Sequence, residues 1–302
     1  MKYRPKHVLE YVLLRTACGI LSLLPYRAAL VFGWIVAKPA FWLLQSRRRE
    51  AIRRLRIVLG ADLPFRKANA IAWQSFRNIA FNLVEMVYMS RPASWQRPLN
   101  MEMQKALVEF KAYVDLHPGQ GGIFSCAHTG NWELAGLLAP QCGIRMFTIF
   151  AAQKNPLVSR YLKRLRHGPN VELIQRGALN LREILANLNG GKFMALMPDL
   201  RSKQPGVPVH FLGGTANLYP GMGQLSRQTD VPIFLAITKR HGWTRHTLDL
   251  YGPFQPDTSL PKKQDISRLM QQVMDIVDSE IRKNPEQWFW YNKRWILDPL
   301  AS

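Results

Sequence analysis

A histidine followed five residues later by a glutamate is the strongest chemical signal in the sequence. The segment SCAHTGNWELAG covers residues 125–136, with His128 after an apolar run and Glu133 just inside a helical pattern. A carboxylate beside a histidine fixes the imidazole tautomer and stabilises the imidazolium, so the pair can act as a general base. Such a base can deprotonate an alcohol or amine that attacks a thioester. The two side chains can meet only if His128 lies in the turn before the helix, because five residues on one helix point apart.

Two other kinds of catalysis have weaker support. Cys126 would share the His128 face on an extended strand, but we interpret it as an inert buried cysteine because nothing nearby in the sequence favours a thiolate. The nucleophile elbow Gly-x-Ser-x-Gly of α/β hydrolases is absent. No His/Cys cluster has the spacing of a zinc site, so we predict no metal.

The elements that must position His128 alternate between strands and helices. Short apolar runs predict strands at 121–127, 144–150, 193–197 and 231–237, with an edge strand at 246–252. Helical patterns lie at 132–139, 156–167, 178–189 and 219–228, and a last amphipathic helix covers 264–283. This alternation predicts an α/β fold with a mixed, mostly parallel sheet flanked by helices. His128 then lies at the carboxyl end of a strand, where ligand sites of such sheets collect.

The N-terminal region is apolar but interrupted. Charged residues break the stretch from Val8 to Arg49 into runs of about ten residues, whereas a clean spanning helix needs roughly 20. Six arginines follow at once: Arg47, Arg48, Arg49, Arg53, Arg54 and Arg56. Such a cluster favours an anionic lipid surface. We expect residues 1–49 to form a helical membrane anchor that lies in or dips into the interface, and 50–302 an α/β domain; the alternative is a pair of buried core helices.

Two further helices are expected between these regions. An amphipathic pattern covers 65–89, with Phe81, Leu83 and Met86 among its apolar positions. Another covers 102–115, after a proline-containing break at 91–98.

The charge balance points to an anionic partner. The chain has 302 residues, 41 Lys plus Arg and 20 Asp plus Glu, for a net charge of +21. With 47% hydrophobic residues it is no disordered tail. We find no nucleic-acid-binding module, so specific nucleic-acid binding is a remote alternative. The charge instead favours a membrane surface or a phosphorylated substrate.

Four other blocks accompany HTGNWE in a consistent order. They are Asn155-Pro156, MPD at 197–199, FLGG at 211–214 and PEQWFWYNKRW at 285–295. Together they resemble the late acyltransferases of lipid A biosynthesis, of the lauroyl or myristoyl type, within the His-x4-Asp/Glu glycerolipid acyltransferase superfamily. The chain departs from that pattern at Leu200-Arg201 and Asn292, where the family often has Gln or His.

The resemblance implies a glycerolipid acyltransferase-like fold and a membrane-associated enzyme on the cytoplasmic face of the inner membrane. It implies transfer of a fatty acyl chain from an acyl carrier protein or CoA thioester to a hydroxyl of a lipid A precursor, with no further cofactor. His128 would be the general base and Glu133 would orient it, while backbone N–H groups near Gly130-Asn131 would bind the oxyanion. Related branches acylate phosphatidylinositol mannosides and other lipids, so another glycolipid or a phospholipid is the alternative acceptor.

Residues in or near these blocks are the candidates for substrate binding. Arg160, Lys163 and Arg164 fall on one helix face and could bind phosphates or an acidic carrier protein. Asp199 follows a buried strand and could orient His128 or Arg201, or contact substrate. The full set of candidates is Asn131, Lys154, Arg164, Arg166, Arg176, Asp199 and Arg201. We expect Trp288, Trp290 and Trp295 to serve in packing or at an interface.

Overall fold

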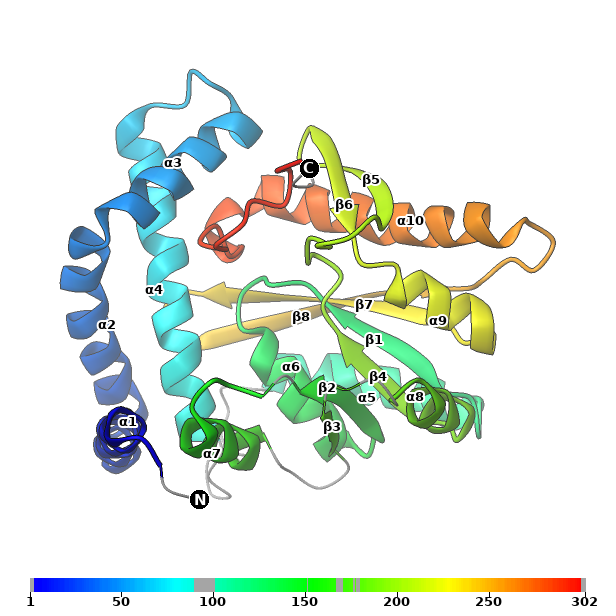
Figure 1. Cartoon of the computed structure of the whole chain (residues 1–302), viewed down its shortest axis with the longest axis horizontal. Helices are drawn as coiled ribbons and strands as arrows, with labels where there is room; N and C mark the ends of the chain where they lie inside the picture. The colour runs from blue at the N-terminus through cyan, green and yellow to red at the C-terminus, as the bar shows by residue number, and fades with distance from the viewer. Residues whose placement is uncertain are drawn as a thin grey trace.

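A six-stranded sheet forms the centre of the molecule (Figure 1). The computed structural model describes residues 3–89, 101–150, 152–166, 171–175, 177 and 180–299. The strand order is β3-β2-β4-β1-β7-β8. The bounds are β1 Gly122–Cys126, β2 Met146–Phe150, β3 Val171–Gln175, β4 Phe193–Leu196, β7 Ile233–His241 and β8 Arg245–Phe254. Only the edge strand β8 runs antiparallel to its neighbour in this sheet, so the predicted mostly parallel α/β fold is confirmed.

Helices cover both faces of the sheet, as an alternating chain requires. The helices that follow the N-terminal region are α5 Met101–Leu116, α6 Trp132–Leu138, α7 Pro156–Arg166, α8 Asn180–Asn189, α9 Gly221–Thr229 and α10 Lys262–Lys283. Successive residues of β1 point to opposite faces. Ile123 packs in the cluster that contains α9 and α10, whereas Phe124 packs with α5 and α6.

Four helices form the N-terminal region: α1 Pro5–Leu23, α2 Tyr26–Leu43, α3 Gln45–Leu59 and α4 Phe65–Met89. In Figure 1, α4 stands between α2 and the ends of β7 and β8. The expected domain boundary at residue 49 lies inside α3, and Ala51 and Leu55 of that helix belong to the main core. Within the described residues no single helix has both the length and the apolar character needed to cross a bilayer. Helices α2 and α3 meet this criterion only when they are taken together, and the chain bends by 86° between them.

Some expectations need correction. Strand β3 and the hairpin of β5 (Val207–Phe211) and β6 (Gly214–Leu218) were not predicted. Leu83 is exposed rather than packed. Arg54 does not belong to a lipid-facing cluster, because it is buried and its Nη1 donates to the carbonyls of Trp290 and Asn292, each at 2.8 Å. The predicted break at 91–98 lies outside the described residues.

Candidate active site

His128 lies in a short turn between β1 and α6, as the sequence pattern predicted. The strand ends at Cys126 and the helix begins at Trp132. Gly130 has a φ of +50°, which a glycine adopts without a steric penalty. The Asn131 side chain caps α6 by accepting a hydrogen bond from the Leu134 N–H at 3.3 Å. The turn therefore places His128 at the carboxyl end of a central strand.

Asp199 is the residue that holds the His128 ring. Its Oδ1 lies 2.8 Å from His128 Nδ1, and its Oδ2 accepts the His128 backbone N–H at 3.0 Å. Asp199 comes shortly after β4, the parallel neighbour of β1, so the two carboxyl ends meet at one sheet edge. With Nδ1 donating to the carboxylate, Nε2 carries the lone pair that can accept a proton. The His128 side chain is 16% exposed and the Asp199 side chain is fully buried.

The charge of this pair is set by its surroundings. Burial alone would lower the pKa of His128, but the Asp199 carboxylate, its hydrogen bond and the more weakly acting Glu133 raise that pKa above its ordinary value. Burial would raise the pKa of Asp199. The imidazole, together with hydrogen bonds from His128 and Trp288, holds the pKa of Asp199 below its ordinary value instead. Asp199 is thus an ionised partner for a histidine that can become protonated during a reaction.

The C-terminal segment is hydrogen-bonded to Asp199 and to the turn that carries His128. The indole Nε1–H of Trp288 donates to Asp199 Oδ2 at 2.8 Å. The Phe289 N–H donates to the His128 carbonyl at 3.1 Å, and the Gly130 N–H donates to the Gln287 carbonyl at 2.9 Å. Trp288, Trp290 and Trp295 are all buried, as the packing interpretation predicted. Because the Gly130 N–H is engaged with Gln287, it is not the oxyanion donor that we expected.

Glu133 faces an apolar cavity of about 410 Å³. The cavity extends along β2 and beside the carboxyl halves of β1 and β4, and its wall includes Trp132, Leu137 and Met222. Among the described residues that line it, Glu133 alone carries a charge. The hydrogen bond to His128 Nδ1 that we expected from Glu133 is made by Asp199. The local spacing thus found the histidine and a nearby carboxylate, but the partner of the ring nitrogen comes from the next strand.

The other predicted residues lie in different places. Asn131 is buried, and both ends of its amide are engaged: Oδ1 caps α6 and Nδ2 donates to Glu85 Oε2 at 2.5 Å. The Arg201 guanidinium donates to the carbonyls of Asp298 and Pro299. Lys154 and Arg164 are exposed at the start and on the outer face of α7. Arg176 and the Arg166 side chain fall outside the described residues.

A second hollow, of about 360 Å³, opens along α7. Arg160 and Lys163 line it, and it shares Phe150 and Leu173 with the apolar cavity. Two of the three basic residues that we placed on one helix face thus border a concave surface. The basic hollow and the apolar cavity therefore lie next to each other and share part of a wall.

Cys126 has the environment of an inert thiol. It is buried, and burial, with the nearby charges of Asp199 and Glu133, raises the pKa of its thiol far above the ordinary range. This agrees with its interpretation as a strand cysteine.

Comparison with known proteins identifies the family of this chain. The model of the family described as bacterial lipid A biosynthesis acyltransferase matches residues 5–296. The chain belongs to this family. The predicted resemblance is thereby confirmed, and the family name indicates an acyltransferase.

Curated relatives come from mycobacteria. A phosphatidylinositol mannoside acyltransferase of Mycolicibacterium smegmatis is 26% identical over 189 residues, which are 61% of this chain and 59% of that protein. One from Mycobacterium tuberculosis is 26% identical over 193 residues, 62% of this chain and 58% of that protein. The chain therefore spans less than two thirds of the length of these relatives.

In this member of the lipid A biosynthesis acyltransferase family, two of the sequence blocks serve the framework. The Asn155 side chain caps α7 through the Leu157 N–H at 3.0 Å, while its amide donates to the His7 carbonyl and to Glu10 Oε2, each at 2.9 Å. The Asn-Pro block thus ties α7 to α1. The FLGG block forms the turn between β5 and β6, where the Leu212 N–H donates to Asp278.

Proposed function

We propose that this chain transfers a fatty acyl group from an acyl thioester to a hydroxyl of a membrane glycolipid. The observation that carries the proposal is the His128–Asp199 pair beside an apolar cavity of about 410 Å³. A cavity of this size and lining suits an acyl chain, because each buried CH₂ contributes about 0.8 kcal/mol. A buried carboxylate that fixes the histidine tautomer suits general-base catalysis.

The proposed reaction needs no covalent enzyme intermediate. His128 Nε2 takes the proton of the acceptor hydroxyl as that oxygen attacks the thioester carbonyl. The tetrahedral intermediate collapses by breaking the C–S bond, which forms the ester and expels the thiolate. The His128 imidazolium then gives its proton to the thiolate, so the carrier leaves as a free thiol. Asp199 stays ionised throughout and stabilises the imidazolium.

The basic hollow along α7 supports a phosphorylated substrate. Arg160 and Lys163 border it, and it adjoins the apolar cavity. Lipid A precursors, acyl-CoA and the phosphopantetheine arm of a carrier protein all carry phosphate that such residues can bind. We place the phosphate of the donor or the acceptor here, with the exposed Lys154 and Arg164 as flanking contacts.

The lipid A precursor is the acceptor we propose first, because the family description names lipid A biosynthesis. A phosphatidylinositol mannoside or another glycolipid is the second candidate, because the mycobacterial relatives carry that name. Both acceptors are glycolipids that bear phosphate and free hydroxyls. The phosphate-binding residues and the base would serve either one.

We also propose that α1 and α2 rest on the membrane at the cytoplasmic face of the inner membrane. Their exposed apolar side chains include Leu9, Leu13, Leu23, Ile35 and Leu43. Arg47 and Arg49 are exposed at the start of α3. Apolar residues flanked by basic ones suit an interfacial contact with anionic lipid.

The test is expression in a host that makes lipid A but lacks its late acyltransferases, followed by mass spectrometry of all membrane lipids. The wild type should add one acyl mass to lipid A, and His128→Ala should add none. The matched control is His210→Ala, an exposed histidine on β5, which should behave as the wild type.

A purified assay separates the possible outcomes. The protein is mixed with acyl carrier protein or CoA thioesters and with either a lipid A precursor or a phosphatidylinositol mannoside. Acylation of the mannoside alone would replace the first acceptor with the second. Thioester consumption without any acylated lipid, or unchanged activity in His128→Ala, would overturn the proposal.

A further inference from the structure

The buried face of α4 carries a stripe of polar residues. Ser75, Asn78, Asn82 and Glu85 are three, four and three positions apart, which places them on one side of the helix. Each of the four is between 1% and 4% exposed. A helix that packs against a core normally presents apolar residues on that face. These four residues need an explanation beyond packing.

The first half of the stripe holds the C-terminal segment. Ser75 Oγ donates to the Trp288 carbonyl at 2.5 Å, and Asn78 Nδ2 donates to the Glu286 carbonyl at 3.2 Å. Trp288 is the residue whose indole donates to Asp199. Ser75 and Asn78 thus fix the backbone that presents this donor to the carboxylate.

The second half of the stripe holds the turn that carries His128. Asn82 Nδ2 donates to the Gly130 carbonyl at 2.6 Å, and Glu85 Oε2 accepts from Asn131 Nδ2 at 2.5 Å. Gly130 and Asn131 follow His128 by two and three residues. Helix α4 is therefore hydrogen-bonded both to the turn after His128 and to the C-terminal segment that contacts Asp199.

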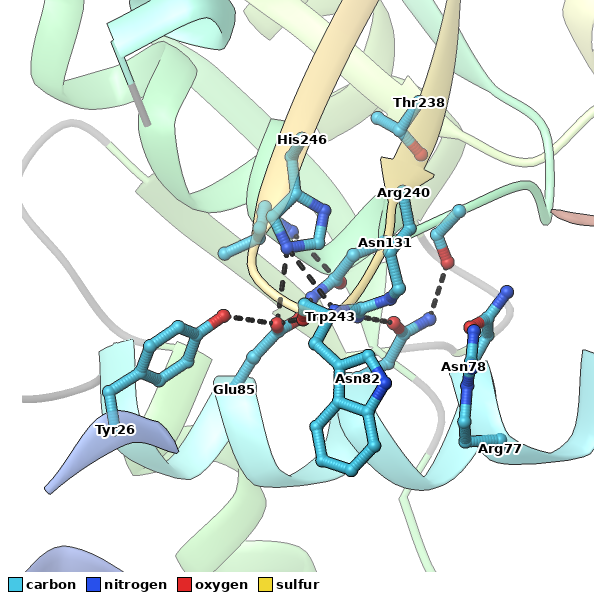
Figure 2. Close-up of polar contacts among 12 residues, drawn as sticks. Tyr26, Arg77, Asn78, Asn82, Glu85, Asn131, Thr238, Arg240, Trp243 and His246 are labelled. Atoms are coloured by element: carbon cyan, nitrogen blue, oxygen red, sulfur yellow. Dashed lines mark hydrogen bonds and ion pairs between the residues drawn. The ribbon is translucent and has the colours of Figure 1, made fainter. Parts of the chain in front are cut away.

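A buried ion pair fixes the orientation of the Asn82 and Glu85 side chains. Arg240 of β7 donates from Nη1 to Glu85 Oε1 at 2.7 Å and from Nη2 to Glu85 Oε2 at 2.6 Å, and Figure 2 shows the surrounding contacts. Arg240 Nη2 also donates to Asn82 Oδ1 at 2.8 Å, so the amide of Asn82 must point its nitrogen at Gly130. Tyr26 and His246 donate to Glu85 Oε1 as well. Every contact around Glu85 is thus directional.

We propose that the polar stripe Ser75–Asn78–Asn82–Glu85 is a positioning element that sets the geometry of the His128–Asp199 pair from outside the active site. These residues touch neither reacting group directly. They act through the Gly130 and Trp288 backbones. Directional hydrogen bonds fix a backbone more narrowly than apolar contacts do, and small displacements of a catalytic group cost rate steeply. The inference rests on the proposed function only for its rate readout.

The primary test follows His128 itself and needs no substrate. The protein is labelled with ¹⁵N-histidine, the His128 ring signals are assigned with His128→Ala, and their titration is recorded in wild type, Asn82→Ala and Ser75→Ala. The charges that act on His128 are those of Asp199 and Glu133. A looser contact with Asp199 removes part of what raises the pKa, so we expect the midpoint in Asn82→Ala to fall by ~0.5 or more.

Matched controls separate positioning from general loss of stability. Ser226→Ala removes a fully buried hydroxyl that donates to the Val231 carbonyl at 2.7 Å, which matches the Ser75 change. Asn217→Ala removes a half-buried amide that bonds the Gln204 and Gly206 backbone, as the Asn82 amide bonds the Gly130 backbone. Both controls should leave the His128 midpoint in place. Unchanged midpoints in Ser75→Ala and Asn82→Ala, or equal shifts in the controls, would overturn the inference.

Turnover supplies the second readout. With the acyl thioester and the acceptor glycolipid, Asn82→Ala should lower kcat by about tenfold or more. The KM for each substrate should stay within about twofold. A shifted His128 midpoint in a protein that acylates no lipid would leave the positioning inference intact and overturn the proposed function. An unshifted midpoint in a protein that does acylate a lipid would overturn the positioning inference and leave the proposed function intact.

Discussion

The histidine and the aspartate of the site are 71 residues apart, and only the sheet brings them together. From the sequence, the nearer carboxylate of Glu133 was the natural partner, because it follows His128 in the same turn and helix. Asp199 was a candidate for orienting His128, but its place depends on β4 lying next to β1, which a single sequence does not reveal. At the residue scale, the local pattern placed His128 in the turn before α6, whereas the carboxylate that bonds its Nδ1 comes from a neighbouring strand.

Replacing Asp199 tests the assignment of this partner. Asp199→Asn removes the charge that raises the pKa of His128, while burial, which lowers that pKa, remains. In the proposed mechanism the general base must be neutral, so acyl transfer should rise with pH through the pKa of His128. The acidic limb of the kcat/KM profile should therefore move to lower pH in Asp199→Asn. At pH 8 the rate should fall by about 10²–10⁴-fold, because the ring loses its fixed tautomer.

Glu133→Gln is the matched control for that change. It also removes one carboxylate charge near His128 but keeps the hydrogen bond at Nδ1. The acidic limb should move less than in Asp199→Asn, since Glu133 contributes the weakest of the effects on the pKa of His128. A larger shift in Glu133→Gln would restore Glu133 as the partner of the base.

The proposed direct attack by the acceptor predicts that no acyl group becomes covalently bound to the protein. Cys126, two residues before His128, is the rival nucleophile, but its thiol is buried and its pKa is raised far above the ordinary range. We expect no added acyl mass on the intact protein after it is mixed with an acyl thioester in the absence of acceptor. An acyl adduct that forms at the rate of turnover, and maps to Cys126, would contradict the mechanism.

At the scale of elements, the turn between β1 and α6 is closely confined by its neighbours. Gly130 has a positive φ, and a Cβ on it would overlap the backbone of Thr238 and Lys239. The Thr129 carbonyl also accepts a hydrogen bond from Thr238 Oγ1. The turn is therefore pressed against β7 on one side and held by α4 on the other.

Gly130→Ala should therefore lower stability as well as activity. We expect a loss of about 2 kcal/mol or more in the free energy of unfolding, because backbone strain and overlap combine. Urea denaturation measures it. The control is Gly19→Ala in α1, where a new Cβ meets nothing within 4 Å. That change should be neutral or stabilise by about 0.5–1 kcal/mol through helix propensity. Equal effects of the two substitutions would contradict the close approach of Gly130 to β7.

The order of the elements was largely predictable, because buried parallel strands have apolar sequences that differ sharply from the intervening helices. The runs at 121–127 and 231–237 became β1 and β7 in this way. The missed strand β3 has the sequence VELIQ, whose alternation is too short to separate from a loop. The stripe on α4 was missed for another reason. Polar residues on an amphipathic helix usually face solvent, and only the docking of α4 against residues 286–288 and against the turn at 130–131 shows that these four are buried.

For the whole molecule, the net charge of +21 leaves open how a membrane would be recognised. A diffuse positive field would attract any anionic surface to any side of the protein. A defined docking face requires basic residues next to exposed apolar ones. The junction of α2 and α3 meets that requirement, with Leu43 and Leu44 beside Arg47 and Arg49, all exposed. Arg48 is less available for contact with lipid, because its guanidinium stacks on the Trp42 ring at 3.9 Å from the ring centroid.

Charge reversal distinguishes a defined docking face at the junction of α2 and α3 from diffuse attraction by the whole positive charge. Arg47→Glu/Arg49→Glu and Lys262→Glu/Lys263→Glu make the same change of four charges. The second pair is exposed at the start of α10, at the end of the molecule remote from α2 and α3 (Figure 1). If the junction docks on lipid, binding to vesicles with 30% anionic lipid at ~150 mM salt should weaken by about 30-fold or more in the first variant, since each basic residue near the surface contributes about 1 kcal/mol. The second variant should bind within about threefold of the wild type. Equal losses would mean that the whole charge of the molecule, and not this face, draws it to the membrane.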